Sequence, residues 1–294
     1  MPIFRKRDSG HNRRIFVVMT DFHSGKRIGL LNPATVLVKQ NDDGSILEWQ
    51  PEQTITQAWL WSVYMDGLGQ LKEWAGVDEI IICHNGDITN GDRFDSNIPE
   101  TTREDQRIIA CDNLRPYVEL PNVKKIRLMT GTAVHVPECA EARIAYRLRE
   151  ETGKDIESRH HARFSMGQDV IEVAHHGPFP GSRDWIMGNV AFLHLKDRVA
   201  RDRRGNKPPA RIYLYGHYHA LVHACLKDRW HGQCCESDLV VVPALCGLDD
   251  FARKVTKSAP VLDAGIVALE FIDGKLTDMR DFVQENDLRT EEEL

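Results

Sequence analysis

Short apolar runs recur along the chain, and longer stretches with helical spacing separate them. The runs are rich in Ile and Val and end at glycine or polar residues, which is typical of buried strands. We predict five of these strands, at residues 14–20, 78–84, 124–130, 169–176 and 211–217. The stretches between them predict helices near residues 53–74, 102–114, 137–151 and 183–202, of which the second is stopped by Pro116. In the last helix, Ile186, Val190 and Leu193 are aligned on one face.

This alternation of strands and helices predicts βαβ units and a layered α/β fold. Two turn sequences, at residues 41–45 and 272–275, predict β-hairpins. The second hairpin indicates an antiparallel, strand-rich C-terminal part. We therefore expect two packed sheets with outer helices in a single domain over residues 14–284. A basic segment (1–13) would precede this domain, and an acidic tail (285–294) would follow it.

Composition and charge narrow the class of protein. Of the 294 residues, 41% are hydrophobic, but no stretch approaches the roughly 20 apolar residues of a membrane span. The basic start lacks the apolar core of a signal peptide, so we expect a cytoplasmic protein with no membrane partner. The seven cysteines are expected to be buried thiols rather than a disulfide framework. The net charge of −6 disfavours a globally basic nucleic-acid binder. It does not exclude a local basic groove, which residues 198–211 could form.

A polar cluster follows each of the five predicted strands. The clusters contain, in chain order, Asp21 and His23; Asp87, Asn90 and Asp92; Thr132 and His135; His175 and His176; and His217 and His219. Ligands of α/β sheets bind beyond the carboxyl ends of the strands, so we expect these side chains to share one crevice. Imidazole and carboxylate together suit Mn, Fe, Zn, Co or Ni. Their number favours two ions, which clamp the oxygens of a phosphoryl group in hydrolytic enzymes.

The ordered motifs D-x-H, G-D, a G-x-H-like segment, H-G and G-H-x-H resemble those of the calcineurin-like metallophosphoesterases, over about residues 16–220. The resemblance implies a two-sheet αββα-type sandwich that hydrolyses phosphodiester bonds with a metal-bound hydroxide at a dinuclear site. It implies that Asp21, His23, Asp87 and His219 hold the first ion. Asp87, His176 and His217 would hold the second ion, with Asp87 bridging. Two divalent ions are expected as cofactors, with Mn preferred over Fe, Zn, Ni or Co.

The third motif departs from the family pattern. The family usually has G-N-H-[DE], whereas this chain has the sequence GTAVHV at residues 131–136. Thr132 stands where the asparagine would be, so we expect the second ion to be bound more weakly. His135, displaced by two residues, is expected to protonate the leaving group, and Asn90 to orient it. Thr132, His175 and Asp92 are expected to be weak ligands or to hydrogen-bond to ligands.

Three alternatives stay open. The substrate is expected to be a phosphoester, and a nuclease acting on DNA or RNA would use the same chemistry, with residues 198–211 as its groove. A non-catalytic metal-binding scaffold would account for the altered third motif. A second group of residues could hold structural zinc, although its spacing is not that of a standard finger: His223, Cys225, His231, Cys234 and Cys235.

Overall fold

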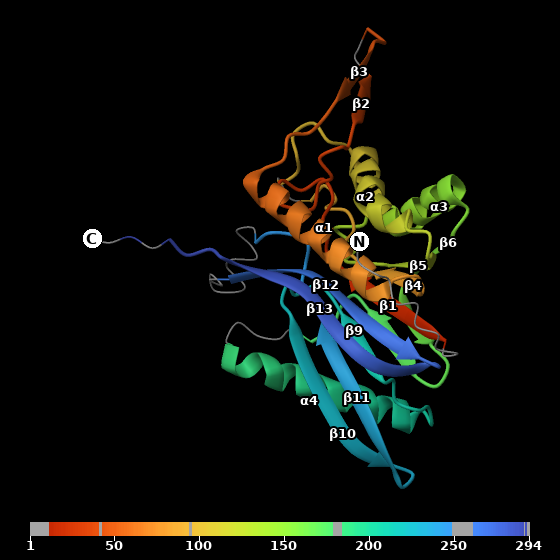
Figure 1. Ribbon diagram of the computed structural model, residues 1–294. Helices are drawn as coiled ribbons and strands as arrows, with labels where there is room; N and C mark the ends of the chain where they lie inside the picture. The colour runs from red at the N-terminus through yellow and green to blue at the C-terminus, as the bar shows by residue number, and fades with distance from the viewer. Residues whose placement is uncertain are drawn as a thin grey trace, which may run out of the picture.

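The computed structural model describes residues 12–40, 43–93, 96–178, 184–248, 261–290 and 292, without the side chains of residues 184–187. The basic residues 1–11 and part of the acidic tail therefore lie outside the described residues. The described chain contains four helices: α1 (Ile55–Ala75), α2 (Arg103–Val118), α3 (Ala140–Thr152) and α4 (Asp184–Arg204). It also contains three sheets, so the mixed α/β class predicted from the sequence is confirmed (Figure 1).

The largest sheet has six strands in the order β13-β12-β1-β4-β5-β6. Its members are β1 (Arg13–Met19), β4 (Glu79–His84), β5 (Val123–Met129), β6 (Asp155–Arg159), β12 (Val261–Ile272) and β13 (Lys275–Asp287). Strands β1, β4, β5 and β6 are parallel, and β12 and β13 form an antiparallel hairpin. The C-terminal hairpin predicted at residues 272–275 is therefore confirmed. Residues 285–287 of the expected tail belong to β13.

The second sheet has five strands in the order β10-β11-β9-β8-β7. Its members are β7 (His161–Ser165), β8 (Val170–Ala174), β9 (Ile212–Tyr215), β10 (Val222–Trp230) and β11 (Gln233–Val241). Strands β8, β9 and β11 are parallel. A separate hairpin, β2 (Leu37–Gln40) and β3 (Ile46–Trp49), confirms the first predicted hairpin and extends from one end of the molecule (Figure 1). Residues 41 and 42 of its turn lie outside the described residues.

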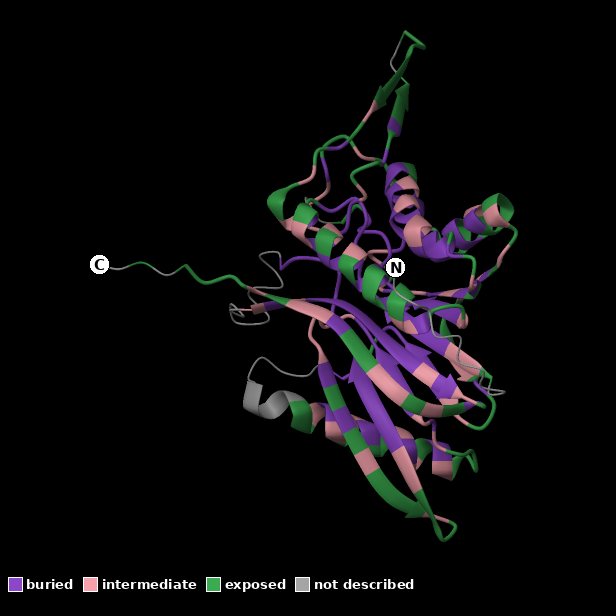
Figure 2. Ribbon diagram, in the orientation of Figure 1, coloured by how far each residue is buried: buried purple, intermediate pink, exposed green. Residues whose placement is uncertain are grey.

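The two larger sheets pack face to face, with helices on their outer faces. Along β1, side chains alternate between two cores: Ile15, Val17 and Met19 face α1, α2 and α3, whereas Phe16 and Val18 face the second sheet. Helix α4 packs on the outer face of the second sheet. Figure 2 shows the resulting pattern, with buried strands inside and one exposed side along α1. This layering brings the carboxyl ends of the parallel strands of both sheets together.

Helix α2 corrects the predicted helix end at Leu114. The helix continues to Val118 and contains Pro116 in its last turn. Proline lacks an amide hydrogen, so the carbonyl of Asp112, four residues earlier, loses its helical donor. The side-chain amide of Asn32 replaces that donor at 2.9 Å. A partner distant in the sequence therefore makes the proline tolerable.

Two further expectations from the sequence were wrong in part. Leu193 of α4 is 63% exposed, and the buried apolar positions among the described side chains of this helix are Ala191, Leu195 and Val199. The side chain of Ile186 lies outside the described residues. All seven cysteines are free, as expected, but Cys139, Cys225 and Cys234 are exposed rather than buried. No helix within the described ranges combines the length and apolar character that crossing a bilayer requires.

Candidate metal centre

The polar clusters that follow the five predicted strands converge at one edge of the two sheets. Asp21 and His23 follow β1, Asp87 follows β4, Thr132 and His135 follow β5, His175 and His176 follow β8, and His217 and His219 follow β9. The loops after β1 and β4 are joined by hydrogen bonds from Asp21 N to Gly86 O and from His23 N to Asp87 O, both 3.0 Å. The amide of His217 donates to Asp21 Oδ2 at 3.0 Å and links the two sheets.

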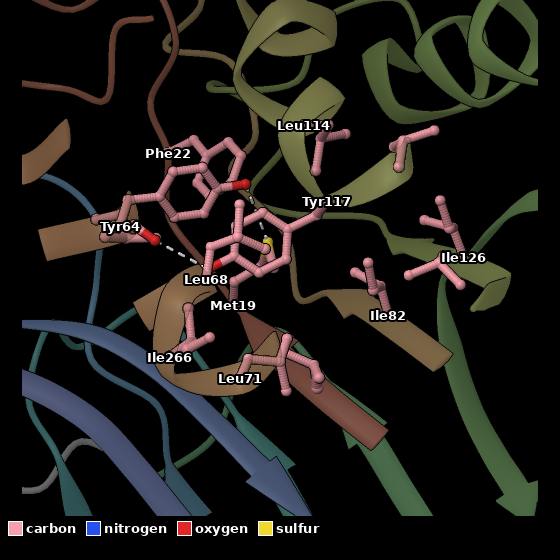
Figure 3. Packing of buried hydrophobic residues seen from close by; sticks show 14 of the residues in the cluster. Met19, Phe22, Tyr64, Leu68, Leu71, Ile82, Leu114, Tyr117, Ile126 and Ile266 are labelled. Atoms are coloured by element: carbon pink, nitrogen blue, oxygen red, sulfur yellow. Dashed lines mark hydrogen bonds between the residues drawn. The ribbon is translucent and has the colours of Figure 1, made fainter. Parts of the chain in front are cut away.

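The hydrophobic core holds the first of these loops. Phe22 lies between Asp21 and His23 and is fully buried. Its ring packs edge-on against Tyr64 of α1, with 5.5 Å between ring centroids (Figure 3). The Tyr117 hydroxyl of α2 donates in turn to the Tyr64 carbonyl at 3.0 Å. Because an aromatic anchor separates them, Asp21 and His23 are both directed away from the core toward the sheet edge.

Backbone strain is concentrated in these loops. Five of the predicted ligands have positive φ angles: Asp21 (54°), His23 (43°), Asp87 (51°), His217 (74°) and His219 (50°). Non-glycine residues in this region cost on the order of 1 kcal/mol or more each, and they persist where a functional geometry is imposed. Only glycine fits at position 131 without a shift of its neighbours, because a Cβ at this position would lie 2.1 Å from Asp87 N. The loop after β5 therefore packs directly on Asp87.

Asp21, His23 and His219 form the first of two overlapping clusters. Their ligand atoms lie within 4.8 Å of one another. The Nε2 atoms of His219 and His23 lie 3.5 Å and 3.7 Å from Asp21 Oδ1. Asp21 Oδ1 and the Nδ1 atoms of both histidines are buried without a hydrogen-bond partner. Buried polar atoms are normally paired, so this set of nitrogen and oxygen atoms is suited to a bound cation.

The second cluster surrounds Thr132. Ring nitrogens of His175, His176 and His217 lie within 4.8 Å of one another. In an overlapping group, one ligand atom from each of Asp21, Asp87, His175 and His217 lies within the same distance of the others. The hydroxyl of Thr132 lies 3.1 Å from Asp87 Oδ2, 3.2 Å from His176 Nε2 and 3.3 Å from His217 Nδ1. The buried Asp/His clusters can therefore hold metal ions, and Asp87 contacts residues of both groups.

The two adjacent histidines differ in their surroundings. His176 is exposed, whereas His175 is buried. His175 Nδ1 lies 2.6 Å from the carbonyl of Asn85 and must donate its proton there, since a carbonyl only accepts. His175 Nε2 faces Asp87 Oδ2 at 3.1 Å. The sequence assigned His175 a supporting role, and the structure brings it into contact with the candidate ligand Asp87.

The two carboxylates of the site are ionised, and His23 is neutral. Burial alone would raise the pKa of Asp21, but His175, His219 and His23 outweigh burial and hold it well below its usual range. Burial is outweighed in the same way at Asp87, whose pKa is held down by His175 and His217. Burial lowers the pKa of His23 to about 4. The site therefore offers two anionic carboxylates and a neutral imidazole, the protonation states that metal ligands require.

His135 also points into this region. Its Nδ1 lies 2.8 Å from the backbone carbonyl of Asn90, so Nδ1 carries the proton in the neutral ring and Nε2 is left as an acceptor. Its ring lies edge-on to His23, with 4.6 Å between centroids, and a third group of ligand atoms joins His23, Asp87 and His135. The sequence expected Asn90 to orient His135, and the contact is made by the backbone of Asn90. The Asn90 side chain bonds instead to Ser96 and Asn97.

Asp92 lies apart from these clusters. It forms an ion pair with Arg103, whose guanidinium also binds Glu138 at 2.8 Å. This bridge joins the loop after β4 to the end of the loop that carries His135. Among the described residues, Asp92 belongs to none of the groups with metal-ligand spacing.

The proposed zinc residues do not assemble as expected. Cys225 lies beside Glu236 and Asp238, and His231, Cys234 and Cys235 are not part of that group in the described chain. His223 binds Asp238 at 2.9 Å, and Arg211 pairs with both carboxylates. The charge that would attract a cation is therefore already compensated by a guanidinium.

The basic residues 198–211 are largely paired. Arg198 binds Glu172, Arg201 binds Asp197 at 2.8 Å, and Arg203 binds Asp228 at 2.7 Å. Asp202, which lies between Arg201 and Arg203 on α4, binds the Ala210 amide and the Tyr213 hydroxyl at the start of β9, whereas His217 follows the end of that strand. Arg201 and Arg203 therefore lie away from the metal centre. No protein-family model and no curated protein matches this chain.

Proposed function

We propose that the chain is a metal-dependent phosphoesterase of the calcineurin-like type, which hydrolyses phosphodiesters at a centre of two divalent ions. The observation that carries this proposal is the set of overlapping Asp/His groups, in which Asp87 lies with Asp21, His175 and His217 in one group and with His23 in another. Two packed sheets with outer helices agree with the αββα arrangement that the motif resemblance implies. The order of the motifs along the chain and their meeting at one sheet edge support the same family.

The donor atoms fit two cations. Asp21, His23 and His219 would hold the first ion, because the buried Asp21 Oδ1 has no hydrogen-bond partner and faces the Nε2 atoms of both histidines. His176 and His217 would hold the second ion. Asp87 would bridge, since its carboxylate is within reach of both groups. Imidazole and carboxylate donors without thiolate suit manganese, iron, zinc, nickel or cobalt, and of these we propose manganese.

Bound divalent ions would supply Lewis acidity and neutralise the charge that develops on the phosphoryl oxygens. The protein's own residues position these charges and handle protons. His175 places a positive charge beside Asp87 in the metal-free chain, because its pKa is raised to about 9: burial would lower it, but Asp87 and Asp21 outweigh burial. Thr132 holds both carboxylate oxygens of Asp87 by its amide and its hydroxyl.

His135 would protonate the departing oxygen. The Asn90 carbonyl fixes the proton on Nδ1, so Nε2 is the nitrogen that gains and gives up a proton. The ring lies beside His23 and at the edge of the centre, where a leaving group would depart. Poor alkoxide leaving groups need such an acid, which favours phosphodiesters as substrates.

The alternatives gain less support. A nuclease would need a cationic surface next to the metal centre, and the arginines expected to form it are paired and distant. A non-catalytic scaffold was suggested by the altered third motif, but Thr132 of that motif contacts Asp87, His176 and His217.

A substrate screen tests the proposal. Metal-stripped protein would be reloaded with Mn²⁺ and assayed on nitrophenyl phosphate mono- and diesters, and on DNA and RNA oligonucleotides. We expect Mn²⁺-dependent hydrolysis of the small diester. Hydrolysis of oligonucleotides with binding that weakens steeply in salt would favour the nuclease. Full metal binding with no hydrolysis of any ester would leave only the scaffold.

A further inference from the structure

Glu141 is a buried acid that the sequence did not single out. It lies in the first turn of α3, behind the loop that carries Thr132 and His135, and only 1% of its surface is exposed. An acidic residue at this position normally serves the helix N-terminus from the solvent side. Glu141 instead turns inward, and its Oε1 accepts a hydrogen bond from the amide of Gly131 at 3.1 Å.

The surroundings of this carboxyl are unusual. Its second oxygen, Oε2, is buried without a partner. Burial raises the pKa of Glu141 to about 7, and the negative charge of Asp87 adds to this effect. A buried polar group of this kind is costly unless the contact that it makes is needed. The hydrogen bond from the Gly131 amide compensates part of this cost.

Gly131 links Glu141 to Asp87. The next amide along the chain, that of Thr132, donates to Asp87 Oδ1 at 2.5 Å. Two consecutive amides are thus held by two different carboxyl groups, one from α3 and one from the candidate metal centre. Gly131 itself fits tightly, because an added Cβ would lie 2.2 Å from Asp87 Oδ1. A displacement of the Gly131 amide would move Thr132 and with it the orientation of Asp87.

We propose that Glu141 is a positioning residue, which holds the Gly131 amide so that Thr132 orients the carboxylate of Asp87 for two metal ions. The proposal rests on the proposed function of the centre. Glu141 acts through Gly131 and Thr132 and belongs to none of the metal-ligand groups found among the described residues. Residues of this kind typically change metal affinity by roughly 10- to 100-fold when they are removed.

Three substitutions separate positioning from a merely structural role. Glu141→Gln keeps an oxygen that accepts from Gly131. Glu141→Asp keeps the charge but withdraws the carboxyl from the amide, and Glu141→Ala removes it. Glu150→Ala, at an exposed position of the same helix, is the matched control. Thermal unfolding would first establish which variants fold.

The first measurement is amide hydrogen exchange of Gly131 and Thr132 in the metal-free protein, which does not depend on the proposed function. We expect both amides to exchange faster in Glu141→Ala and Glu141→Asp, with the protection of β4 and β5 unchanged. Glu141→Gln and the control should match the wild type. Unchanged exchange of both amides in Glu141→Asp would overturn the proposal, even if the alanine variant does not fold.

The second measurement is calorimetric titration of the metal-free variants with Mn²⁺. We expect a roughly 10- to 100-fold weaker binding of the ions in Glu141→Asp and near-normal binding in Glu141→Gln. If the glutamine variant binds as weakly as the aspartate variant, an oxygen that accepts from Gly131 does not restore metal affinity, and the proposal is wrong. If the wild type binds no metal, the proposed function fails, whereas the exchange result still decides whether Glu141 holds the loop.

Discussion

Thr132 binds both carboxylate oxygens of Asp87: its amide donates to Oδ1 at 2.5 Å, and its hydroxyl donates to Oδ2 at 3.1 Å. The same hydroxyl lies within 3.3 Å of ring nitrogens of His176 and His217. A residue that departs from the family motif therefore occupies the middle of the second cluster. It orients Asp87, the candidate bridging ligand.

Replacing Thr132 with Asn should tighten the second ion. A carboxamide oxygen is a better metal ligand than a hydroxyl, and the backbone amide that binds Asp87 is retained. We expect the affinity of the second step in a Mn²⁺ titration to rise on the order of tenfold, as for other changes next to metal ligands. Thr132→Ser should leave both steps unchanged. Two steps that are unaffected by Thr132→Asn would show that this side chain does not face an ion.

Replacing Asp87 with Asn should remove both ions together. The substitution keeps the shape of the side chain but removes an anionic charge that is grouped with His23 on one side and with His175 and His217 on the other. Metal content, measured on purified protein, should fall from two ions to none, and activity should fall to background. Asp92→Asn is the matched control, because Asp92 pairs with Arg103 outside the clusters. Normal metal content in Asp87→Asn would contradict the bridging role.

The motifs predicted the position of the candidate site better than the contacts within it. Strand ends with Asp and His were enough to locate it, because parallel strands deliver their carboxyl ends to one edge. The resemblance assigned His176 as the ligand and His175 a supporting role, but the sequence did not reveal that His175 is buried against Asp87, since that contact depends on the second sheet. Glu141 carried no signal, because an acid in the first turn of a helix is ordinary.

The fold was likewise predicted from the sequence only in part. The buried parallel strands were predicted from their apolar runs, whereas the half-exposed β7 and the long β10–β11 hairpin were not, because their charged residues hide the alternation. The end of α2 was predicted at Leu114, before Pro116, whereas the helix continues to Val118. The Asn32 side chain that replaces the missing donor is distant in the sequence, so the local pattern did not reveal it. A contact with a residue distant in the sequence therefore decides where this helix ends.

The metal-free protein should lose stability in alkaline solution through His175. Its folded-state pKa of about 9 exceeds its usual value of 6.5, so the folded chain binds this proton more tightly than the unfolded chain. The stabilisation, on the order of 3 kcal/mol, is fully present below pH 6.5 and is lost as the pH rises through 9. Urea unfolding at pH 6 and pH 10 should show this loss in the wild type and not in His175→Gln. Equal losses in both proteins would assign the effect to other groups.

Replacing His135 with Asn should separate acid catalysis from metal binding. The variant should keep its metal content and fold, because His135 is held by the Asn90 carbonyl rather than by the core. Diesters with poor leaving groups should slow by roughly 10²- to 10⁴-fold, the usual contribution of a general acid. A nitrophenyl ester should slow much less, since nitrophenolate departs without a proton. Loss of metal would make His135 a ligand, and an equal loss on both substrates would indicate positioning.

The most direct test of the dinuclear centre is the rate of hydrolysis of a nitrophenyl phosphodiester as Mn²⁺ is added stepwise to the metal-stripped protein. Because Asp87 contacts residues of both clusters, the chain should bind two ions, and the less strongly held second ion should complete the centre. We expect little activity after the first equivalent of Mn²⁺ and a steep rise that ends at the second. Activity that is complete at one equivalent, or that is absent with two ions bound, would contradict a dinuclear phosphoesterase.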